Sequence, residues 1–252
     1  KATRDMYLDR AGNVTDASQI GHLAAGVPGT VAGLWAAHQK HGKRPWAELV
    51  APAARLARDG FVVNPYLERS MHKAQDLLLR YDETRRVYLI NELTPRAGAT
   101  LRQPDLARTL GRIQAGGAKG FYQGETARLI AGDMAKHKGL ITLQDLASYQ
   151  AKWREPLAFT YRGHRVYSMP PPSSGAVTLA QIMNILEGYD LRAAGWHTAK
   201  HAHLMVEAER RAYTDRNTYL GDPDFVRHMP IERLMSKAYA AERRSTIRPD
   251  YA

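Results

Sequence analysis

The chain has 252 residues, of which 44% are hydrophobic and 24% charged, a composition typical of a globular protein with one large domain or two small ones. It has no cysteine, which excludes disulfides and thiolate chemistry, and no apolar run approaches the length of a membrane-spanning helix, about 18 residues. The formal net charge of +11 comes from 36 Lys and Arg against 25 Asp and Glu, but the basic residues are dispersed and lack interleaved aromatics that stack on bases. We therefore expect no nucleic-acid partner and no membrane span, and the surplus charge also fits a basic piece that pairs with an acidic partner piece.

Apolar residues at helical spacing and local turn chemistry organise the first part of the chain. The turn sequence at 9–13 predicts a hairpin that pairs residues 6–8 with Val14, and the polar stretch 84–103 is predicted to be irregular. Thr142 is a predicted helix cap, with Asp145 as the reciprocal carboxylate of a capping box, and Thr30 is a second predicted cap. Helices are predicted over 31–41, 45–60 with a kink or break at Pro52, 64–80, 104–115 ended by Gly116-Gly117, and 125–137.

A β-hairpin and three helices are predicted for the rest of the chain. Residues 157–161 and 164–168 alternate in polarity around Arg162-Gly163, which is typical of a hairpin. Helices are predicted over 175–188, 198–219 and 230–244. Because a two-stranded unit is marginal alone and the chain has too few strands to extend it, we expect another chain or segment to complete the sheet.

One short run, 167–175, marks the corner where this hairpin leads into a helix. The three prolines Pro170–Pro172 each fix the backbone angle φ at about −65° and lack an N–H donor, so the run is neither a helix nor a central strand. Ser173, Ser174 and Gly175 then enter a helix whose first N–H groups lack partners. Such a corner holds active-site backbone in some proteins and is a plain connection in others. A serine nucleophile would lack the G-x-S-x-G elbow and a nearby His or Asp, so helix capping is favoured for at least one serine.

Two histidine pairs on a predicted helix match metal-ligand spacing. His197 and His201 are four residues apart, and so are His203 and Glu207. The Glu that follows the first His in a zinc-protease motif is absent, so a polar surface role is favoured and no metal site is expected.

Two further patterns admit a binding role beside a structural one. Asp222 and Asp224 flank Pro223, but the regular alternation of oxygen ligands in a calcium loop is missing, so a turn is favoured. The run Gly116–Gly120 lacks the order of a phosphate-binding loop and follows a helix rather than a strand, so a helix end is favoured. Taken alone, the chain has no complete catalytic constellation.

Collinear segments through nearly the whole chain resemble the large subunit of γ-glutamyltranspeptidase. The proline corner resembles the P-P-P-S-S-G-G signature of that family. The other matching segments are, in chain order, Lys1–Asp9, Gly26–Gly33, Leu56–Phe61, Gly139–Thr142, Asp145-Leu146, Tyr161–Gly163, Ala212–Arg216 and Tyr219–Phe225. Several of these matches are long, so the resemblance is specific.

The resemblance implies an N-terminal-nucleophile hydrolase, made as a precursor that cuts itself into a large and a small subunit. The implied fold class is α+β and helix-rich, the large-subunit part of a four-layer αββα sandwich whose sheets a small subunit completes. Residues 1–252 would then form a single domain, an incomplete large subunit. The implied activity is cleavage of the γ-glutamyl amide of glutathione or related compounds, with transfer of the acyl group to water, amino acids or peptides. No cofactor is implied, and bacterial members are periplasmic or secreted.

The resemblance places the catalytic residue outside this chain. The nucleophile is the threonine that opens the small subunit, expected beyond Ala252, so this chain alone is predicted to be inactive and contributes no catalytic residue. The arginine that grips the substrate α-carboxylate is expected before Lys1, and Arg4 is not assigned to that role. Ser173, Ser174 and Gly175 are the candidates for the pocket wall.

One departure and two alternatives remain. Ala176 replaces the second glycine of the signature. An alanine would be strained at positive φ and harmless in the first turn of a helix, and we expect Ala176 to lie in the first turn. The alternatives are a catalytically silent helical scaffold or binding module of the same fold, and a related N-terminal-nucleophile acylase.

Overall fold

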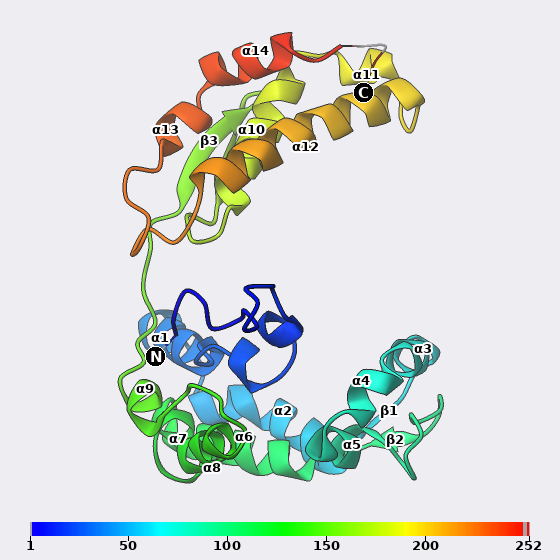
Figure 1. The fold of residues 1–252 in the computed structure, drawn as a ribbon, viewed down its shortest axis with the longest axis vertical. Helices are drawn as coiled ribbons and strands as arrows, with labels where there is room; N and C mark the ends of the chain where they lie inside the picture. Colours follow the sequence, from blue (N-terminus) through cyan, green and yellow to red (C-terminus); the bar gives the residue numbers. More distant parts are fainter. Residues whose placement is uncertain (1, 249–250, 252) are drawn as a thin grey trace. The chain divides into compact units, whose positions relative to one another are not determined.

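Helices make up most of the computed structural model of the chain, which describes residues 2–248 and 251 (Figure 1). The chain separates into two compact units, Lys1–Lys152 (unit 1) and Trp153–Ala252 (unit 2). The predicted helix-rich class is confirmed, and the sheets of the described residues are two-stranded. The prediction of a single domain over 1–252 concerns the large subunit within a complete protein and stays a prediction. Within the described residues, the helices are all too short or too polar to span a membrane.

Unit 1 is built from short helices around one extensive helix pair, α2 and α6. Its elements are η1 (Asp16–Ser18), η2 (His22–Ala24), α1 (Thr30–His41), α2 (Trp46–Asp59), β1 (Phe61–Val62), α3 (Pro65–Lys73), α4 (Gln75–Leu79), α5 (Asp82–Tyr88), β2 (Thr100–Leu101), α6 (Pro104–Gly116), α7 (Lys119–Tyr122), α8 (Gly124–Lys136) and α9 (Leu143–Ala147). The Trp46 indole at the start of α2 donates to the Ile113 carbonyl near the end of α6 at 2.8 Å, and the Gln103 amide before α6 donates to the Ala57 carbonyl near the end of α2 at 2.8 Å. These bonds fix the pair as antiparallel.

A second core in unit 1 lies where α7, α8 and α9 meet the segment that leads into α1. It is a cluster of buried Tyr122, Ala127, Ile141 and Leu146. The Tyr122 hydroxyl donates to the Pro28 carbonyl at 2.5 Å and accepts from the Ala32 amide at 3.1 Å, so the aromatic ring is buried with its polar end satisfied. Burial raises the pKa of this hydroxyl.

The predicted end of α6 at Gly116-Gly117 is confirmed. Gly117 has φ +57°, and its amide donates to the Ile113 carbonyl at 2.9 Å. A Cβ at Gly117 would lie 2.7 Å from the Trp35 ring, so both the backbone conformation and the close approach require glycine.

Unit 2 surrounds one central helix, α10. Its elements are β3 (Leu157–Tyr161), β4 (His164–Ser168), α10 (Gly175–Glu187), α11 (Leu191–Ala194), α12 (Ala199–Tyr219), α13 (Ile231–Leu234) and α14 (Lys237–Ser245). Strands β3 and β4 pair antiparallel from Leu157↔Ser168 to Tyr161↔His164, as the hairpin prediction required. Helix α10 packs against β3, α12 and α14 and has eight buried residues among its 13, five of them apolar, because neighbours surround it on several sides.

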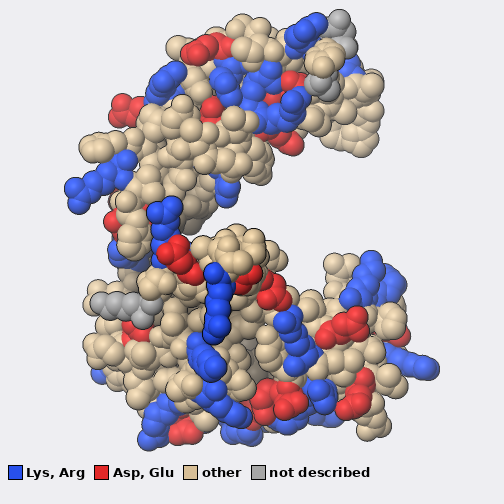
Figure 2. All heavy atoms as spheres, in the orientation of Figure 1, with Lys and Arg blue, Asp and Glu red and all other residues tan. Residues whose placement is uncertain are grey.

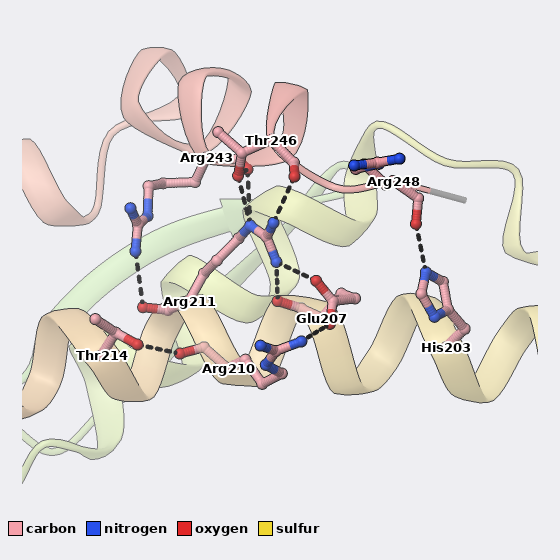
Figure 3. A network of polar contacts seen from close by, with 8 residues as sticks. All are labelled: His203, Glu207, Arg210, Arg211, Thr214, Arg243, Thr246 and Arg248. Carbon is pink, nitrogen blue, oxygen red and sulfur yellow. Dashed lines mark hydrogen bonds and ion pairs between the residues drawn. The ribbon is translucent and has the colours of Figure 1, made fainter. Parts of the chain in front are cut away.

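Polar contacts join α12 to α14 at the side of this core (Figure 3). The Arg211 guanidinium on α12 donates to the carbonyl of Arg243 at 3.1 Å and to the carbonyl and hydroxyl of Thr246, both at 2.7 Å. It also donates to the buried Glu207 carboxylate at 2.5 Å, and Arg210 makes a second bond to that carboxylate. One carboxylate therefore orients two guanidinium groups, one of which caps the end of α14.

Several element predictions differ from the structure. The prediction that 84–103 is irregular is confirmed for 89–99 and wrong at its two ends, since α5 covers Asp82–Tyr88 and β2 (Thr100–Leu101) pairs with β1. The helices predicted over 64–80 and 230–244 are each divided, at Ala74 and at 235–236, and Ser236 caps α14 by accepting from the Tyr239 amide at 3.1 Å. The hairpin predicted for 6–14 is reduced to a bridge between Leu8 and Val14.

The capping predictions had mixed outcomes. Thr142 and Asp145 form the predicted capping box, with the Asp145 amide donating to the Thr142 hydroxyl at 3.2 Å and the Thr142 amide donating to the Asp145 carboxylate at 2.9 Å. Thr30 is wrong as a cap, because it is the first residue of α1 and Gly29 occupies the cap position. The expectation of a kink or a break at Pro52 is half resolved: α2 continues through Pro52 without a break, and the kink stays a prediction. The loss of one backbone hydrogen bond at the proline is offset by packing against α6.

Candidate functional site

The proline corner lies between the end of β4 at Ser168 and the start of α10 at Gly175. Pro171 is buried, and the Met169 carbonyl accepts a hydrogen bond from the Ala176 amide at 3.1 Å. The Ser174 carbonyl accepts from the Thr178 amide at 2.9 Å, the first regular bond of the helix. The corner is therefore fixed by backbone bonds to α10 at its end and by a buried proline in its middle.

The two serines of the corner have different partners. Ser173 lies one residue before the cap position, and its hydroxyl accepts from the Gly175 amide at 3.2 Å, an ST turn that satisfies the first N–H of α10. Ser174 occupies the cap position but makes no side-chain cap bond; its hydroxyl accepts from the Arg216 guanidinium of α12 at 3.1 Å. Among the described residues neither hydroxyl is bonded to a histidine or a carboxylate, so neither has the base that activates a serine nucleophile.

Exposure and conformation separate the residues of the corner. Ser173 and Gly175 are exposed, Ser174 is half-buried, and Ala176 is fully buried. Ala176 is the second residue of α10 and does not have positive φ, so the extra methyl carries no backbone strain, as expected. The pocket-wall role of Ser173, Ser174 and Gly175 stays a prediction.

The two aspartates after α12 form the predicted turn. The Asp224 amide donates to the Asp222 carboxylate at 3.0 Å, an Asx turn. The Arg154 guanidinium lies 3.8 Å from the Asp222 carboxylate and 3.4 Å from that of Asp224. Since an arginine neutralises both carboxylates, the turn interpretation is favoured over a calcium loop.

The histidines of the 197–207 segment are brought into separate contacts. His197 precedes α12, has φ +58° and stacks on Trp196 with ring centroids 4.4 Å apart, so the premise of four-residue helical spacing fails for His197 and His201. The His203 ring bonds the Arg248 carbonyl at 2.8 Å (Figure 3). Glu207 is buried between arginines, and the hydrogen bond from Arg211 holds the pKa of its carboxyl below the ordinary value. These contacts agree with the surface and structural role favoured over a metal site here.

Arg216 is the residue of this region that sequence reasoning missed. It lies 42 positions from Ser174 and ties α12 to the corner through its Nε. The available signal was its place in the Ala212–Arg216 segment, which carries the resemblance. Its neighbour Asp215 is buried, accepts from the Tyr239 hydroxyl at 3.0 Å and pairs with Arg243 at 3.2 Å, which fixes this end of α12 on α14.

Charge on the surface is mixed. On the face drawn in Figure 2, Lys and Arg are interspersed with Asp and Glu on each unit. This distribution agrees with the dispersed basic residues of the sequence, and the expectation of no nucleic-acid partner stays a prediction.

Comparison with known proteins gives consistent matches. A family model described as gamma-glutamyltranspeptidase matches residues 1–252. The chain is 46% identical over 242 residues to the glutathione hydrolase proenzyme of Escherichia coli (strain K12), covering 95% of this chain and 42% of that protein. It is 39% identical over 259 residues to the Acylase ACY 1 proenzyme of Pseudomonas sp. (strain V22), covering 100% of this chain and 46% of that protein. Among solved structures, the gamma-glutamyltranspeptidase of Helicobacter pylori matches with a TM-score of 0.96 and 44% identity, covering 100% of this chain and 72% of that one.

The chain matches only part of each of these proteins. The chain spans less than half the length of the curated relatives it matches, 42% and 46% of the two named above. Both of those relatives are named proenzymes, a name that implies processing of those proteins.

Proposed function

Because the chain belongs to the gamma-glutamyltranspeptidase family, we propose that it forms most of the large subunit of an enzyme that cleaves the γ-glutamyl amide of glutathione and related compounds. The observation that carries the proposal is the match to glutathione hydrolases over almost the whole chain, the proline corner included. In this proposal the γ-glutamyl group passes first to the enzyme and then to water, an amino acid or a peptide.

The proposed chemistry belongs to a threonine beyond Ala252, at the start of a small subunit. Its hydroxyl attacks the γ-glutamyl carbonyl, its own α-amine accepts the proton, and backbone N–H groups stabilise the oxyanion. The corner supports a positioning role for this chain, since the Ser173 and Ser174 hydroxyls bond an amide and a guanidinium rather than a base. Residues Ser173, Ser174 and Gly175 would then shape the wall of the pocket beside that threonine.

The proposed partner is the small subunit cut from the same precursor. Within the described residues β3 and β4 form a two-stranded sheet that packs on α10, and a sheet of two strands is smaller than most. Tyr167 on β4 is 60% exposed, although aromatic residues in strands normally pack against a neighbour. Strands of the small subunit would extend this hairpin into the sheets of a four-layer αββα sandwich.

A second candidate function is that of a related acylase, favoured by the identity to the Acylase ACY 1 proenzyme. A third is a catalytically silent scaffold or binding module with the same architecture. All three share the fold of this chain, so the experiment must separate processing from substrate choice.

The test uses the full-length protein that carries this chain. We expect self-cleavage, seen by intact mass, followed by release of p-nitroaniline from γ-glutamyl-p-nitroanilide; this chain expressed alone should release none. Complete cleavage with turnover of other N-acyl amides and no γ-glutamyl turnover would assign the acylase. Absence of both cleavage and turnover would assign the scaffold.

We also propose that the complete protein is periplasmic or secreted. The support is the resemblance to bacterial members of the family, and the lack of cysteine is compatible with an oxidising compartment. Fractionation of cells that express the full-length gene would test it, and recovery only with the cytosolic marker would contradict it.

A further inference from the structure

Three side chains of unit 1 converge at the end of α8. His22 on η2 and Asp133 on α8 lie 2.8 Å apart, measured from the histidine Nε2 to the carboxylate Oδ2. The Nε2 atom of His137 lies 3.5 Å from the other carboxylate oxygen, Oδ1. The two imidazole rings stack with centroids 4.5 Å apart and an interplanar angle of 13°. Both rings therefore direct a nitrogen at the same carboxylate.

We propose that His22, Asp133 and His137 bind a divalent transition-metal ion of the Zn²⁺ class. One ligand atom from each residue lies within 4.8 Å of the others, and among residues 2–248 and 251 this is the group that has such a geometry. Ligand atoms at about 2.0–2.2 Å from a tetrahedral Zn²⁺ are about 3.3–3.6 Å apart, so no pair of the present ligand atoms has to move by more than about 1.5 Å relative to each other to surround an ion. Two imidazoles with one carboxylate are a donor set that favours Zn²⁺, Cu²⁺ or Ni²⁺ over Ca²⁺ or Mg²⁺.

The local structure places these ligands for simple reasons. Asp133 and His137 are four residues apart, so they share one face of the helix. His137 is also the C-cap of α8, where the negative end of the helix dipole favours a cation. Lys138 then turns the chain at φ +59°, and the Gly139 amide returns to the Met134 carbonyl at 2.7 Å.

The same turn brings the distant histidine close. A Cβ at Gly139 would lie 3.1 Å from the Cβ of His22, so the backbone after α8 passes directly beside η2. The His22 side chain is 19% exposed, against 54% for Asp133 and 41% for His137. The site thus has one anchored ligand and two accessible ones.

The surroundings leave room for a fourth ligand. The three residues line an open pocket of about 820 Å³. Three protein ligands around a tetrahedral ion leave one position for water or a small anion, and the pocket gives access to it. Since His22 and Asp133 are 111 positions apart in the sequence, a bound ion would cross-link the segment before α1 to α8. This inference concerns unit 1 alone and does not depend on the proposed function.

The test measures metal binding to the purified full-length protein after treatment with a chelator and dialysis. Isothermal titration with ZnCl₂ should give one site per chain in the wild type and in the control His72→Ala, which removes an exposed histidine of α3. His137→Ala and Asp133→Asn should bind at least about tenfold more weakly. Added Co²⁺ should give the visible d–d absorption of a tetrahedral site in the wild type and the control but not in these two variants.

Both variants are chosen so that weaker metal binding cannot be explained by unfolding. The His137 side chain is 41% exposed, and Asp133→Asn keeps the shape of the side chain and one acceptor oxygen, so both variants should fold, which circular dichroism checks. Zn²⁺ should raise the melting temperature of the wild type and not that of the variants. Failure of the wild type to bind, or equal binding by all four proteins, would mean that the cluster is only a hydrogen-bonded group, and the inference would be overturned.

Discussion

The two units of the chain use carboxylates in different ways. In unit 2, Glu207 and Asp215 are the carboxylates that are buried among the described residues, and each is paired with arginine. In unit 1 the core contacts are made by aromatic rings and neutral hydrogen bonds, such as those of Trp46 and Tyr122, while Asp133 lies at the surface between two histidines. A buried carboxylate bonded to arginine has a structural role, whereas an accessible one shared by two imidazoles can exchange these partners for a metal.

The largest expected effect comes from breaking a buried pair in unit 2. Asp215→Ala removes the acceptor of the buried Tyr239 hydroxyl and the counterion of Arg243, so we expect a loss of about 3 kcal/mol in the free energy of unfolding. Urea denaturation measures it, and hydrogen exchange should accelerate in α12 and α14. Glu209→Ala on the same helix removes an exposed carboxylate and should change stability by less than about 0.5 kcal/mol. Equal effects of the two substitutions would contradict the structural role given to buried pairs.

In unit 1 the sensitive position is a glycine packed against an aromatic ring. Gly117→Ala places a methyl group at positive φ and 2.7 Å from the Trp35 ring. We therefore expect the free energy of unfolding to fall by about 2 kcal/mol or more. Gly116→Ala is the matched control, since a Cβ there meets open space at the end of α6, and it should be neutral or stabilising by about 0.5–1 kcal/mol. Thermal unfolding of both variants measures the difference. An unchanged melting temperature of Gly117→Ala would contradict the prediction, because it would show that the Trp35 ring moves aside at little cost in free energy.

Acid should destabilise unit 2 through its paired carboxylates. Hydrogen bonds from Arg211 and from Lys237 hold the pKa values of Glu207 and Glu187 below their ordinary value. The unfolded chain, with ordinary pKa values of about 4.3, therefore binds more protons, and the stability present above that pH is lost as pH falls through the folded-state pKa values.

Urea midpoints between about pH 3 and pH 7 measure this loss. Because part of it comes from Glu207, the midpoint of Glu207→Gln should fall less steeply with acid than that of the wild type, although it starts lower. Glu209→Gln should follow the wild-type slope. If the urea midpoints of all three proteins fell with pH in parallel, Glu207 would not contribute to the loss of stability in acid.

Several features that depend on residues close together in the sequence were predicted correctly, whereas contacts between distant residues were missed. The capping box at Thr142, the stop at Gly116-Gly117 and the hairpin at 157–168 depend on residues a few positions apart, and all were confirmed. The pairing of β1 with β2 joins strands about 40 residues apart, and two-residue strands carry no periodic signal, so they were missed.

The candidate site shows the same division. The corner could be found from its prolines and serines, but its bond to Arg216 spans 42 positions and was not predictable from spacing. Likewise, Asp133 and His137 had helical spacing, yet the ligand that completes the group, His22, comes from the other end of unit 1. Local patterns thus predict elements, and the partners that make a site come from the tertiary fold.

The smallest expected effect on stability is at the proline corner, where the two serines test whether unit 2 contributes structure or chemistry to the reaction. Ser173→Ala removes the acceptor of the Gly175 amide and Ser174→Ala removes the acceptor of Arg216, so each should lower the free energy of unfolding by about 1 kcal/mol. We expect both variants of the full-length protein to show slower maturation or lower γ-glutamyl turnover, because the corner and α12 would hold the pocket wall less firmly. Mass spectrometry of the large subunit during turnover should find no acyl group on either serine, since neither has a base beside it. A trapped acyl-serine at 173 or 174 would move the chemistry into this chain, and the contrast between a structural role for unit 2 and an exchangeable site in unit 1 would no longer hold.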